Sequence, residues 1–371
     1  MSEGWQSALD RWLSAGLVDT VTATRIRKFE ASREQPTHLR WPILIAIGFG
    51  ALMLAAGVLL FVSAHWDDLS PTGRFSLVLF LVAIFHVGGA IFSERFRALS
   101  TALHGVGTAA LGAGIFLSAQ IFNLQEHWPG GVMLWAAGAW LGWLLRRDWL
   151  QATFVALLTP AWLASEWIDA TEFYKFAEPI LGQGLLLLAL TYLSAVHGQH
   201  REPVRRVLVW IGGIAVIPCA IMAVPETWWG SYGNNIPLSL LILGKGLGMV
   251  LPLLLGFWLR GSKVWMNGIA AVWILVLSFI PPGAKISPYV WAAVASLGLI
   301  AWGLYEARRE RINLGILGFG LTVLFFYFSN VMDKLGRSAS LIGLGILFLV
   351  LGWGLERTRR QLVSKVKAAT A

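Results

Sequence analysis

Long apolar runs alternate with short polar links over most of the chain. The runs lack the residue-by-residue alternation of barrel strands, so they are expected to be helices. About 20 apolar residues are needed for an α-helix to cross the hydrocarbon core of a bilayer. The sequence therefore predicts about twelve membrane-spanning helices. They lie near residues 43–64, 75–92, 99–123, 130–145, 149–168, 179–197, 206–224, 237–258, 264–280, 288–305, 312–329 and 339–355.

Composition supports a membrane protein and argues against a soluble one. Of the 371 residues, 57% are hydrophobic and only 13% are charged, whereas soluble domains carry about 25% charged residues. The mean hydropathy is +0.67. The chain holds 20 Trp and 40 Gly, which suit membrane interfaces and close helix packing. The predicted fold is an all-α polytopic bundle whose main partner is the lipid bilayer.

The distribution of positive charge predicts the orientation of the chain. The net charge of +9 could indicate a nucleic-acid partner, but the basic residues lie in short links and not on a folded polar domain, so we expect no nucleic acid. Of the 29 Lys and Arg residues, 23 fall on alternate links, five on the opposite ones, and Lys245 inside a run. The positive-inside rule then places both termini on the cytoplasmic side of the cytoplasmic (inner) membrane. The basic segments are 1–42, 93–98, 146–148, 198–206, 259–263, 306–311 and 356–371.

The first forty residues predict a small cytoplasmic helical hairpin. They are polar, so no cleavable signal peptide is expected and the first apolar run would act as an uncleaved anchor. Gly16 suits the end of one helix, and Asp19 or Thr20 suits the start of another. Two helices this short are marginal alone, so the hairpin should pack on the membrane domain or serve as a site of protein binding or self-association. The apolar residues expected to be buried are Trp5, Leu9, Trp12, Leu13, Ile26 and Phe29.

The chain is thus expected to contain a hairpin module at 1–40, a transmembrane domain at 41–356 and a basic cytoplasmic tail at 357–371. One cysteine, Cys219, lies inside an apolar run, which excludes an intramolecular disulfide and zinc sites built on Cys pairs. The sequence has no phosphate-binding Gly-Lys-Ser/Thr loop, no His-Glu-x-x-His and no Gly-x-Ser-x-Gly. ATP-driven transport within this chain and zinc proteolysis are therefore unsupported. No cofactor or bound metal is expected, and an enzymatic activity is the less favoured alternative.

The order of several motifs resembles a known family. Trp12-Leu13-Ser14-Ala15-Gly16-Leu17-Val18-Asp19 is followed by Ala23 and Ile26, a Gly-rich first span ends in His65-Trp66-Asp67, and a later span ends in Ala119-Gln120-Ile121-Phe122-Asn123-Leu124. This resembles the bacterial predicted membrane proteins catalogued as domain of unknown function 2157. The resemblance covers residues 1–145 best, and the segments Asn313-Leu314-Gly315 to Tyr327 and Arg337-Ser338 to Gly345 resemble the tail of that family.

The resemblance implies a multi-pass bacterial membrane protein and supplies no activity. In members of the family we expect Asn where His65 stands and Tyr-His where Phe122-Asn123 stand. These departures remove a histidine from the outer end of the third span. They argue against a metal or proton role at that position.

Lys245 is the only basic residue inside an apolar run, in the sequence Gly244-Lys245-Gly246-Leu247-Gly248. A charge at that depth costs several kcal/mol unless it is paired or hydrated. Two alternatives stay open, a functional site or a structural ion pair. The partners expected by depth are Glu166, Glu178, Asp333 or a cluster of backbone carbonyls.

Further polar residues fall inside the second and third spans. Gln120 and Asn123 are three apart and share a helix face, so both should point into the bundle and bond to another span. His104 in the third span and His86 in the second complete the intramembrane set. Each residue could be packed and hydrogen-bonded, or could line a polar cavity.

A second polar group is expected in the outer loops. Two histidines with three carboxylates could bind a divalent cation, but their spacing fits no known site, so solvated loop polarity is the favoured reading. The residues are His65, Asp67, Asp68, Glu126 and His127.

Three functions remain open at this point. The first is a secondary transporter or a lipid or small-molecule carrier, based on helix count, Pro160, Pro218 and Pro252 inside spans, and Lys245. The second is a non-enzymatic envelope or assembly subunit that recruits a cytoplasmic partner through residues 1–40. The third and least favoured is a membrane enzyme that uses the outer-face carboxylates.

Overall fold

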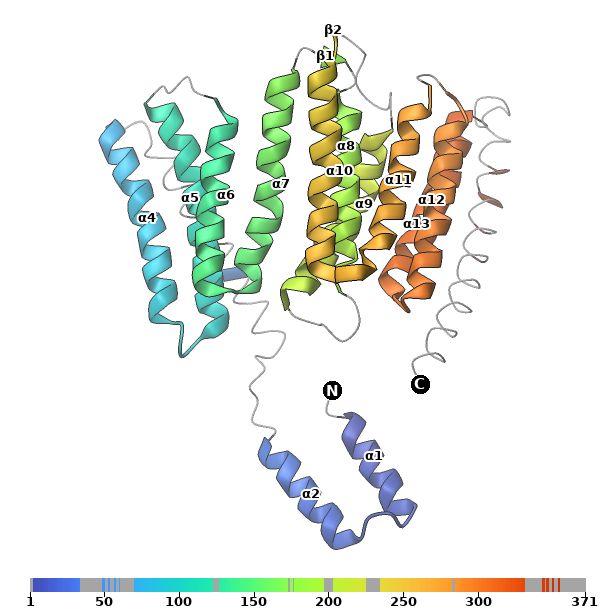
Figure 1. The fold of residues 1–371 in the computed structure, drawn as a ribbon. Coiled ribbons are helices and arrows are strands. Elements are labelled where there is room, and N and C mark those ends of the chain that lie inside the picture. The colour runs from blue at the N-terminus through green and yellow to red at the C-terminus, as the bar shows by residue number, and fades with distance from the viewer. Residues whose placement is uncertain are drawn as a thin grey trace. The chain divides into compact units, whose positions relative to one another are not determined.

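The chain separates into two units, Met1–Ser70 and Pro71–Ala371. The structure is a computed structural model (Figure 1). It describes residues 3–33, 70–122, 127–172, 174–175, 177–196, 203–224, 234–281 and 284–330, with a few further positions between 49 and 60 and between 342 and 353. The predicted spans near 43–64 and 339–355 fall almost wholly outside these residues.

The first unit contains the expected helical hairpin, made of α1 (Glu3–Ser14) and α2 (Thr20–Arg33). Gly16 sits in the turn with φ +69°, a conformation that favours glycine. The Asp19 carboxylate accepts a hydrogen bond from the Thr22 backbone N–H at 3.3 Å and caps α2. The predicted pair of helices with a turn near Gly16 is therefore present.

Burial within the hairpin differs from expectation. Leu9 and Ala23 are buried, at 1% and 0% exposed. Trp12 and Phe29 were expected to be buried but are 48% and 58% exposed. Two helices share only one seam, so the apolar side chains away from it stay at the surface. Leu13 and Ile26 are half-buried, and the Trp5 side chain lies outside the described residues.

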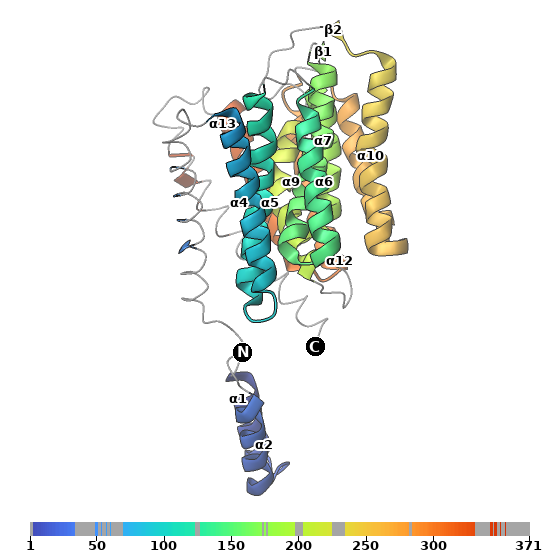
Figure 2. The same cartoon turned by 90° about the vertical axis from the view of Figure 1, so that its left-hand side faces the viewer.

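The second unit is a series of helices that run alternately up and down, as Figures 1 and 2 show. Its two short strands, β1 (Tyr174–Lys175) and β2 (Asn234–Asn235), pair in parallel. The 3-10 segments η1 (Gly261–Val264) and η2 (Val276–Phe279) flank α11. The helices are α4 (Pro71–Ile91), α5 (Arg97–Ile121), α6 (Pro129–Arg146), α7 (Trp149–Thr171), α8 (Ala177–Leu193), α9 (Pro203–Ala223), α10 (Leu238–Arg260), α11 (Trp265–Leu275), α12 (Ser287–Tyr305) and α13 (Arg309–Asn330).

Six helical segments of the described residues are long and apolar enough to cross a membrane. A helical protein with several membrane spans is thus established, and the count of about twelve stays a prediction. The apolar helix α8 is shorter, at 17 residues. The six segments are Pro71–Ile91, Arg97–Ile121, Pro203–Ala223, Leu238–Phe279, Ser287–Tyr305 and Arg309–Asn330.

Consecutive helices pack in antiparallel pairs, α4 with α5, α6 with α7, α8 with α9 and α12 with α13. The α8–α9 pair is closest where glycine removes the side chain. A Cβ on Gly212 of α9 would lie 2.4 Å from the Ala189 carbonyl oxygen and 2.4 Å from the Leu193 nitrogen, both in the α8 backbone. A Cβ on the neighbouring Gly213 would meet nothing nearer than 3.6 Å. Backbone contact through small residues is the usual way in which helices associate in lipid.

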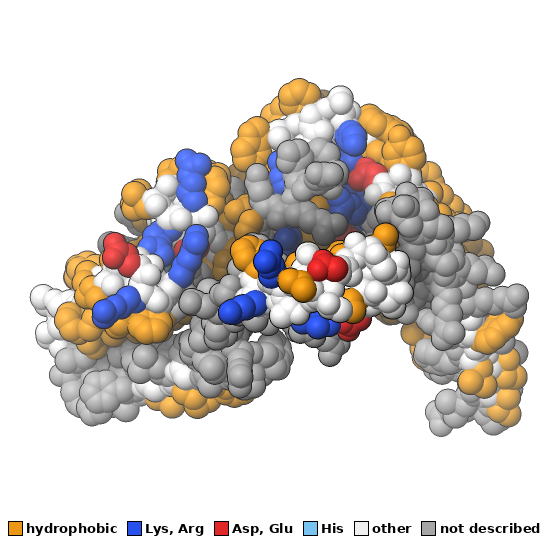
Figure 3. All heavy atoms as spheres, turned by 90° about the horizontal axis from the view of Figure 1, so that it is seen from below, with side chains coloured by type: hydrophobic (Ala, Val, Ile, Leu, Met, Phe, Trp, Pro, Cys, Tyr) orange, Lys and Arg blue, Asp and Glu red, His pale blue; other side chains and the backbone are white. Residues whose placement is uncertain are grey.

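The two ends of the second unit differ in charge. Connections alternate between the ends, and eleven Lys and Arg of the described residues lie at one end, which we call the basic end. Figure 3 views the molecule from that side and shows many such side chains. The opposite end carries three, Arg74, Lys175 and Lys285. The eleven are Arg95, Arg97, Arg146, Arg147, Arg205, Arg206, Arg260, Lys263, Arg308, Arg309 and Arg311.

The contact at Gly212 predicts an unequal effect of two adjacent substitutions. Gly212→Ala should lower stability by roughly 1–3 kcal/mol relative to Gly213→Ala, because only the first drives a methyl group into a neighbouring backbone. Both variants gain similar helix propensity, so their difference isolates the contact. Thermal unfolding in detergent, followed by Trp fluorescence, measures it. Equal midpoints for the two variants would contradict the packing described.

Candidate functional site

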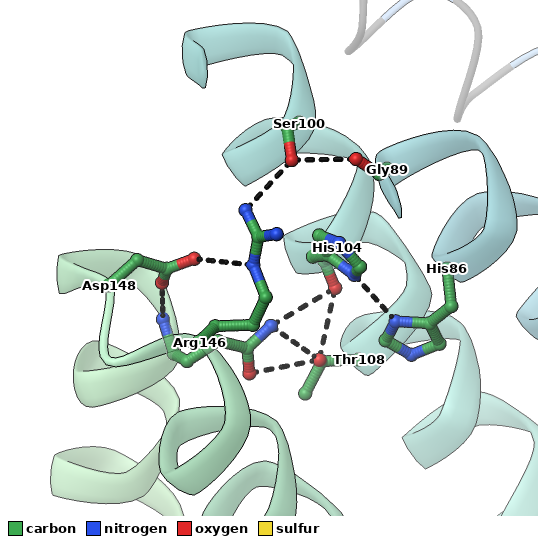
Figure 4. A network of polar contacts seen from close by, with 8 residues as sticks. His86, Gly89, Ser100, His104, Thr108, Arg146 and Asp148 are labelled. Carbon is green, nitrogen blue, oxygen red and sulfur yellow. Dashed lines mark hydrogen bonds and ion pairs between the residues drawn. The ribbon is translucent and has the colours of Figure 1, made fainter. Parts of the chain in front are cut away.

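Two histidines singled out from the sequence meet between α4 and α5. His86 Nδ1 lies 3.0 Å from His104 Nδ1, and the ring centroids are 5.3 Å apart. His104 is buried at 8% exposed, and His86 is half-buried. Figure 4 shows both rings facing each other across the helix pair. The distance is that of an N–H···N hydrogen bond.

Glycines on the facing helices make room for the rings. The His104 ring sits against Gly89 of α4, where a Cβ would come within 2.7 Å of its Cδ2. The His86 ring sits against Gly107 of α5, where a Cβ would come within 2.9 Å. Each histidine thus lies in a seat that a glycine on the opposite helix leaves open. The sequence of each helix supplies one glycine and one histidine, and the packing of α4 against α5 places each glycine opposite a histidine ring.

Polar groups from α6 and α7 surround the backbone of His104. The Gln151 side-chain amide donates to the His104 carbonyl at 3.2 Å and to Thr108 Oγ1 at 2.9 Å. Trp135 Nε1 donates to the Thr108 carbonyl at 2.8 Å. Asp148 caps α7 by accepting from the Gln151 backbone N–H at 2.9 Å. Four helices therefore share one polar network, in which Gln151 and Thr108 are nearly fully buried.

Arg146 covers this network on the basic side. Its Nη2 donates to Ser100 Oγ at 2.8 Å, and Ser100 Oγ donates to the Gly89 carbonyl at 2.7 Å (Figure 4). Its Nε lies 3.8 Å from Asp148 Oδ2, a loose ion pair. His86 is five residues from the end of α4, which is about 7.5 Å along the axis at 1.5 Å per residue. The histidine pair therefore lies one to two helical turns from the basic end.

The pair can hold and pass a proton. Each neutral imidazole carries one N–H, and the Nδ1–Nδ1 bond uses one of them. His104 Nε2 is buried and has no hydrogen-bond partner in the described part of the chain, and such a group calls for an explanation. No group of three or more His, Cys, Asp or Glu suited to a metal ion occurs among the described residues.

Lys245 finds a partner other than those expected. Its Nζ donates to Ser278 Oγ of η2 at 2.9 Å, so the expected bond to a carboxylate or a carbonyl cluster is wrong for the residues described. Asp333 lies outside them. Lys245 lies seven residues after the start of α10, and it is half-buried. The structure does not join it to the histidine pair.

The expectation that the Gln120 side chain points into the bundle is not met. Gln120 is exposed near the end of α5 rather than buried in the bundle. No described residue forms a hydrogen bond with the Gln120 side chain. Asn123 lies outside the described residues. Among the described residues, Gln120 is therefore not part of the network around His86 and His104.

Of the predicted outer-face cluster, only His127 lies among the described residues, because His65, Asp67, Asp68 and Glu126 fall outside them. His127 Nε2 lies 2.7 Å from Glu166 Oε2, and its Nδ1 lies 3.2 Å from Asp169 Oδ2.

These two carboxylates on α7 were not grouped with His127 from the sequence. A ring that contacts a carboxylate through each nitrogen donates from both. The hydrogen bond with Glu166, together with the negative charges of both carboxylates, raises the pKa of His127 above its usual value.

A buried charge cluster at the basic end was missed by sequence reasoning. Arg260 and Arg311 both donate to the Glu306 carboxylate, Arg311 at 2.7 Å, and Trp302 Nε1 donates to it at 2.8 Å. The two guanidinium carbons lie 5.2 and 4.7 Å from the Trp302 ring centroid.

Burial alone would raise the pKa of the Glu306 carboxyl, but the charges of both arginines and the hydrogen bonds it accepts outweigh this, so its pKa lies below the usual value. From the sequence, these charges were assigned only to the positive-inside pattern.

Taken with the fold, this geometry defines a helical membrane protein with several spans and a buried polar network. Residues 10–151 match the family model described as "Predicted membrane protein (DUF2157)", so this part of the chain is similar to that family. The resemblance noted from the sequence is thereby confirmed over these residues, which include the whole network from His86 to Gln151. No curated protein and no solved structure matches the chain.

The raised pKa of His127 predicts a pH-dependent contribution to stability. A raised pKa means that the folded protein binds the proton more tightly than the unfolded chain does. The contribution should be complete below the unfolded pKa of about 6.5 and disappear as the pH rises through the higher folded value. Thermal unfolding of the protein and of His127→Gln as a function of pH measures it. A difference that is constant across this range would contradict the contact with Glu166 and Asp169.

Proposed function

We propose that the chain is a secondary carrier that moves a small molecule or lipid across the bacterial cytoplasmic membrane. The observation that carries the proposal is the buried network of α4–α7 around His86 and His104. Polar and ionisable side chains within a membrane are costly and mark substrate or ion pathways. A purely structural bundle could replace such a network with apolar packing.

The proposal includes a topology of twelve spans with both termini in the cytoplasm. The gathering of basic side chains at one end of the second unit supports it, because cytoplasmic links carry an excess of Lys and Arg. In this topology the basic end faces the cytoplasm, residues 1–40 form a cytoplasmic module, 41–356 the transmembrane domain and 357–371 a basic tail.

Breaks within the helices also support a moving bundle. Pro160, Pro218 and Pro252 lie inside α7, α9 and α10. A proline inside a helix removes a backbone hydrogen bond and favours a kink. At the end of α11 the helix tightens into η2, where Ser278 holds Lys245. Discontinuous helices that place polar groups within the membrane are a recurring feature of secondary transporters.

Alternating access predicts which residues a water-soluble thiol reagent can reach. In a Cys219→Ser background, Thr108→Cys places a thiol in the network. A membrane-impermeant reagent should label it from both sides of oriented vesicles, because a carrier opens its site to each side in turn. Mass spectrometry of the labelled protein gives the extent of labelling.

Three control positions accompany that measurement. Ser231→Cys should react only from outside and Arg309→Cys only from inside, which tests the topology. Leu141→Cys, on an exposed apolar position of α6, should react from neither side. Labelling of Thr108→Cys from one side only, or from neither, would reject the carrier.

A second candidate function rests on the hairpin. Trp12, Leu17 and Val21 are 48%, 74% and 60% exposed, and a concentration of large apolar side chains on a small unit marks an interaction surface. This favours an envelope or assembly subunit that binds a cytoplasmic protein, or a second copy of this chain, through residues 1–40.

The hairpin surface predicts position-specific crosslinking. A photoreactive residue at position 12 should give a crosslinked product in cells, because an exposed Trp on such a surface would be covered by the partner. The same residue at Lys28, a polar position on α2, should not. The mass of the product separates a second copy from another protein. Equal yields from the two positions would exclude the surface.

A further inference from the structure

We propose that His86 and His104 form a proton-transfer pair that binds and releases protons within the membrane. This inference rests on the proposed function, because it makes the proton the ion that drives the carrier. The Nδ1–Nδ1 distance of 3.0 Å and the unpartnered His104 Nε2 are the observations that carry it.

The hydrogen bond fixes how many protons the pair holds. Two neutral imidazoles carry two protons, one between the Nδ1 atoms and the other on Nε2 of the accepting ring. A buried N–H without a partner is rarer than a buried acceptor without one. The bare Nε2 is therefore assigned to His104, which donates through Nδ1, and the Nε2–H to the more exposed His86.

A proton can then cross the pair in three balanced movements. An incoming proton binds the lone pair of His104 Nε2. The proton on His104 Nδ1 passes to His86 Nδ1, and the proton on His86 Nε2 leaves. One proton enters and one leaves, and both rings end in the opposite tautomer. The reverse sequence, or rotation of both rings, restores the starting state.

The surroundings suit a site that changes charge. Arg146 and Asp148, at the turn between α6 and α7, are the charged groups of the described residues that act on His104, and the nearer side chains Ser100, Thr108 and Gln151 are neutral. Because Arg146 bonds Ser100, which bonds Gly89 against the His104 ring, its charge stands between the pair and the basic end. Movement of Arg146 toward Asp148 would weaken the repulsion and admit a proton.

A structural role alone accounts poorly for the arrangement. The imidazoles make no other hydrogen bond among the described residues, although the His104 carbonyl makes two. The seats formed by Gly89 and Gly107 admit the rings at the expense of apolar packing. The simplest explanation for two titratable rings in these positions is that they bind a proton.

Nuclear magnetic resonance tests the pair directly. In protein carrying ¹⁵N-labelled histidine in lipid nanodiscs, a scalar coupling across the hydrogen bond should connect the two Nδ1 nuclei. His86→Asn and His104→Asn should each remove it. His127→Gln, outside the pair, should leave it unchanged. Lowering the pH through the range in which histidine titrates should protonate the two rings in coupled steps, as for two interacting sites.

The outcomes separate this inference from the carrier itself. Absence of the coupling in the folded protein, shown folded by its unfolding midpoint, or independent titration of the two rings, overturns the proton pair. If Thr108→Cys is nevertheless labelled from both sides, the carrier stands and another ion drives it. Coupling and linked titration support the pair. If Thr108→Cys is then labelled from neither side, the proton site stands and the carrier fails.

Discussion

The polar groups inside this bundle must bond to one another, because a bilayer interior offers no water to take their place. This constraint accounts for two of the clusters of buried polar side chains in the described part of the chain. Around His104, hydrogen bonds from Gln151 and Thr108 join α5 to α7. Around Glu306, two arginines join α10 and α13 to the end of α12. The remaining described contacts between helices are mostly apolar and follow the packing of small residues.

The Glu306 cluster shows how a surplus of positive charge is accommodated. Arg205 donates to the carbonyls of Ala195 and Leu259, and Arg260 donates to that of Ser194. These carbonyls lie at the C-terminal ends of α8 and α10, where the helix dipole places partial negative charge. The helix ends and Glu306 therefore both compensate the positive charge of the arginines. This cluster is best understood as a structural contact that holds the helices together. Among the described residues, no comparable set of charges would compensate a positive charge on the histidine pair.

The histidine pair and the His127 contact lie on the same group of helices but use histidine differently. His127 meets Glu166 and Asp169 at the end of α7 opposite the basic end, where both ring nitrogens donate and the charged form is favoured. His86 and His104 meet each other near the basic end, where one proton lies between two rings. The first arrangement holds a proton, and the second can pass one on.

The sequence by itself determined the class of this protein and predicted the direction of its helices. A run of about 20 apolar residues has few stable structures other than a membrane-spanning helix. The charged links indicate which helix ends lie at the same end of the bundle. It also identified His86, His104 and Lys245 as unusual, because each is polar within an apolar run. Only the tertiary structure decided their partners. Five residues or more separate the helix ends from these side chains, and rotation of a helix by one residue turns a side chain by about 100°. Which residues meet therefore depends on packing at Gly89, Gly107 and Gly212, and a single sequence does not encode that register in any local pattern.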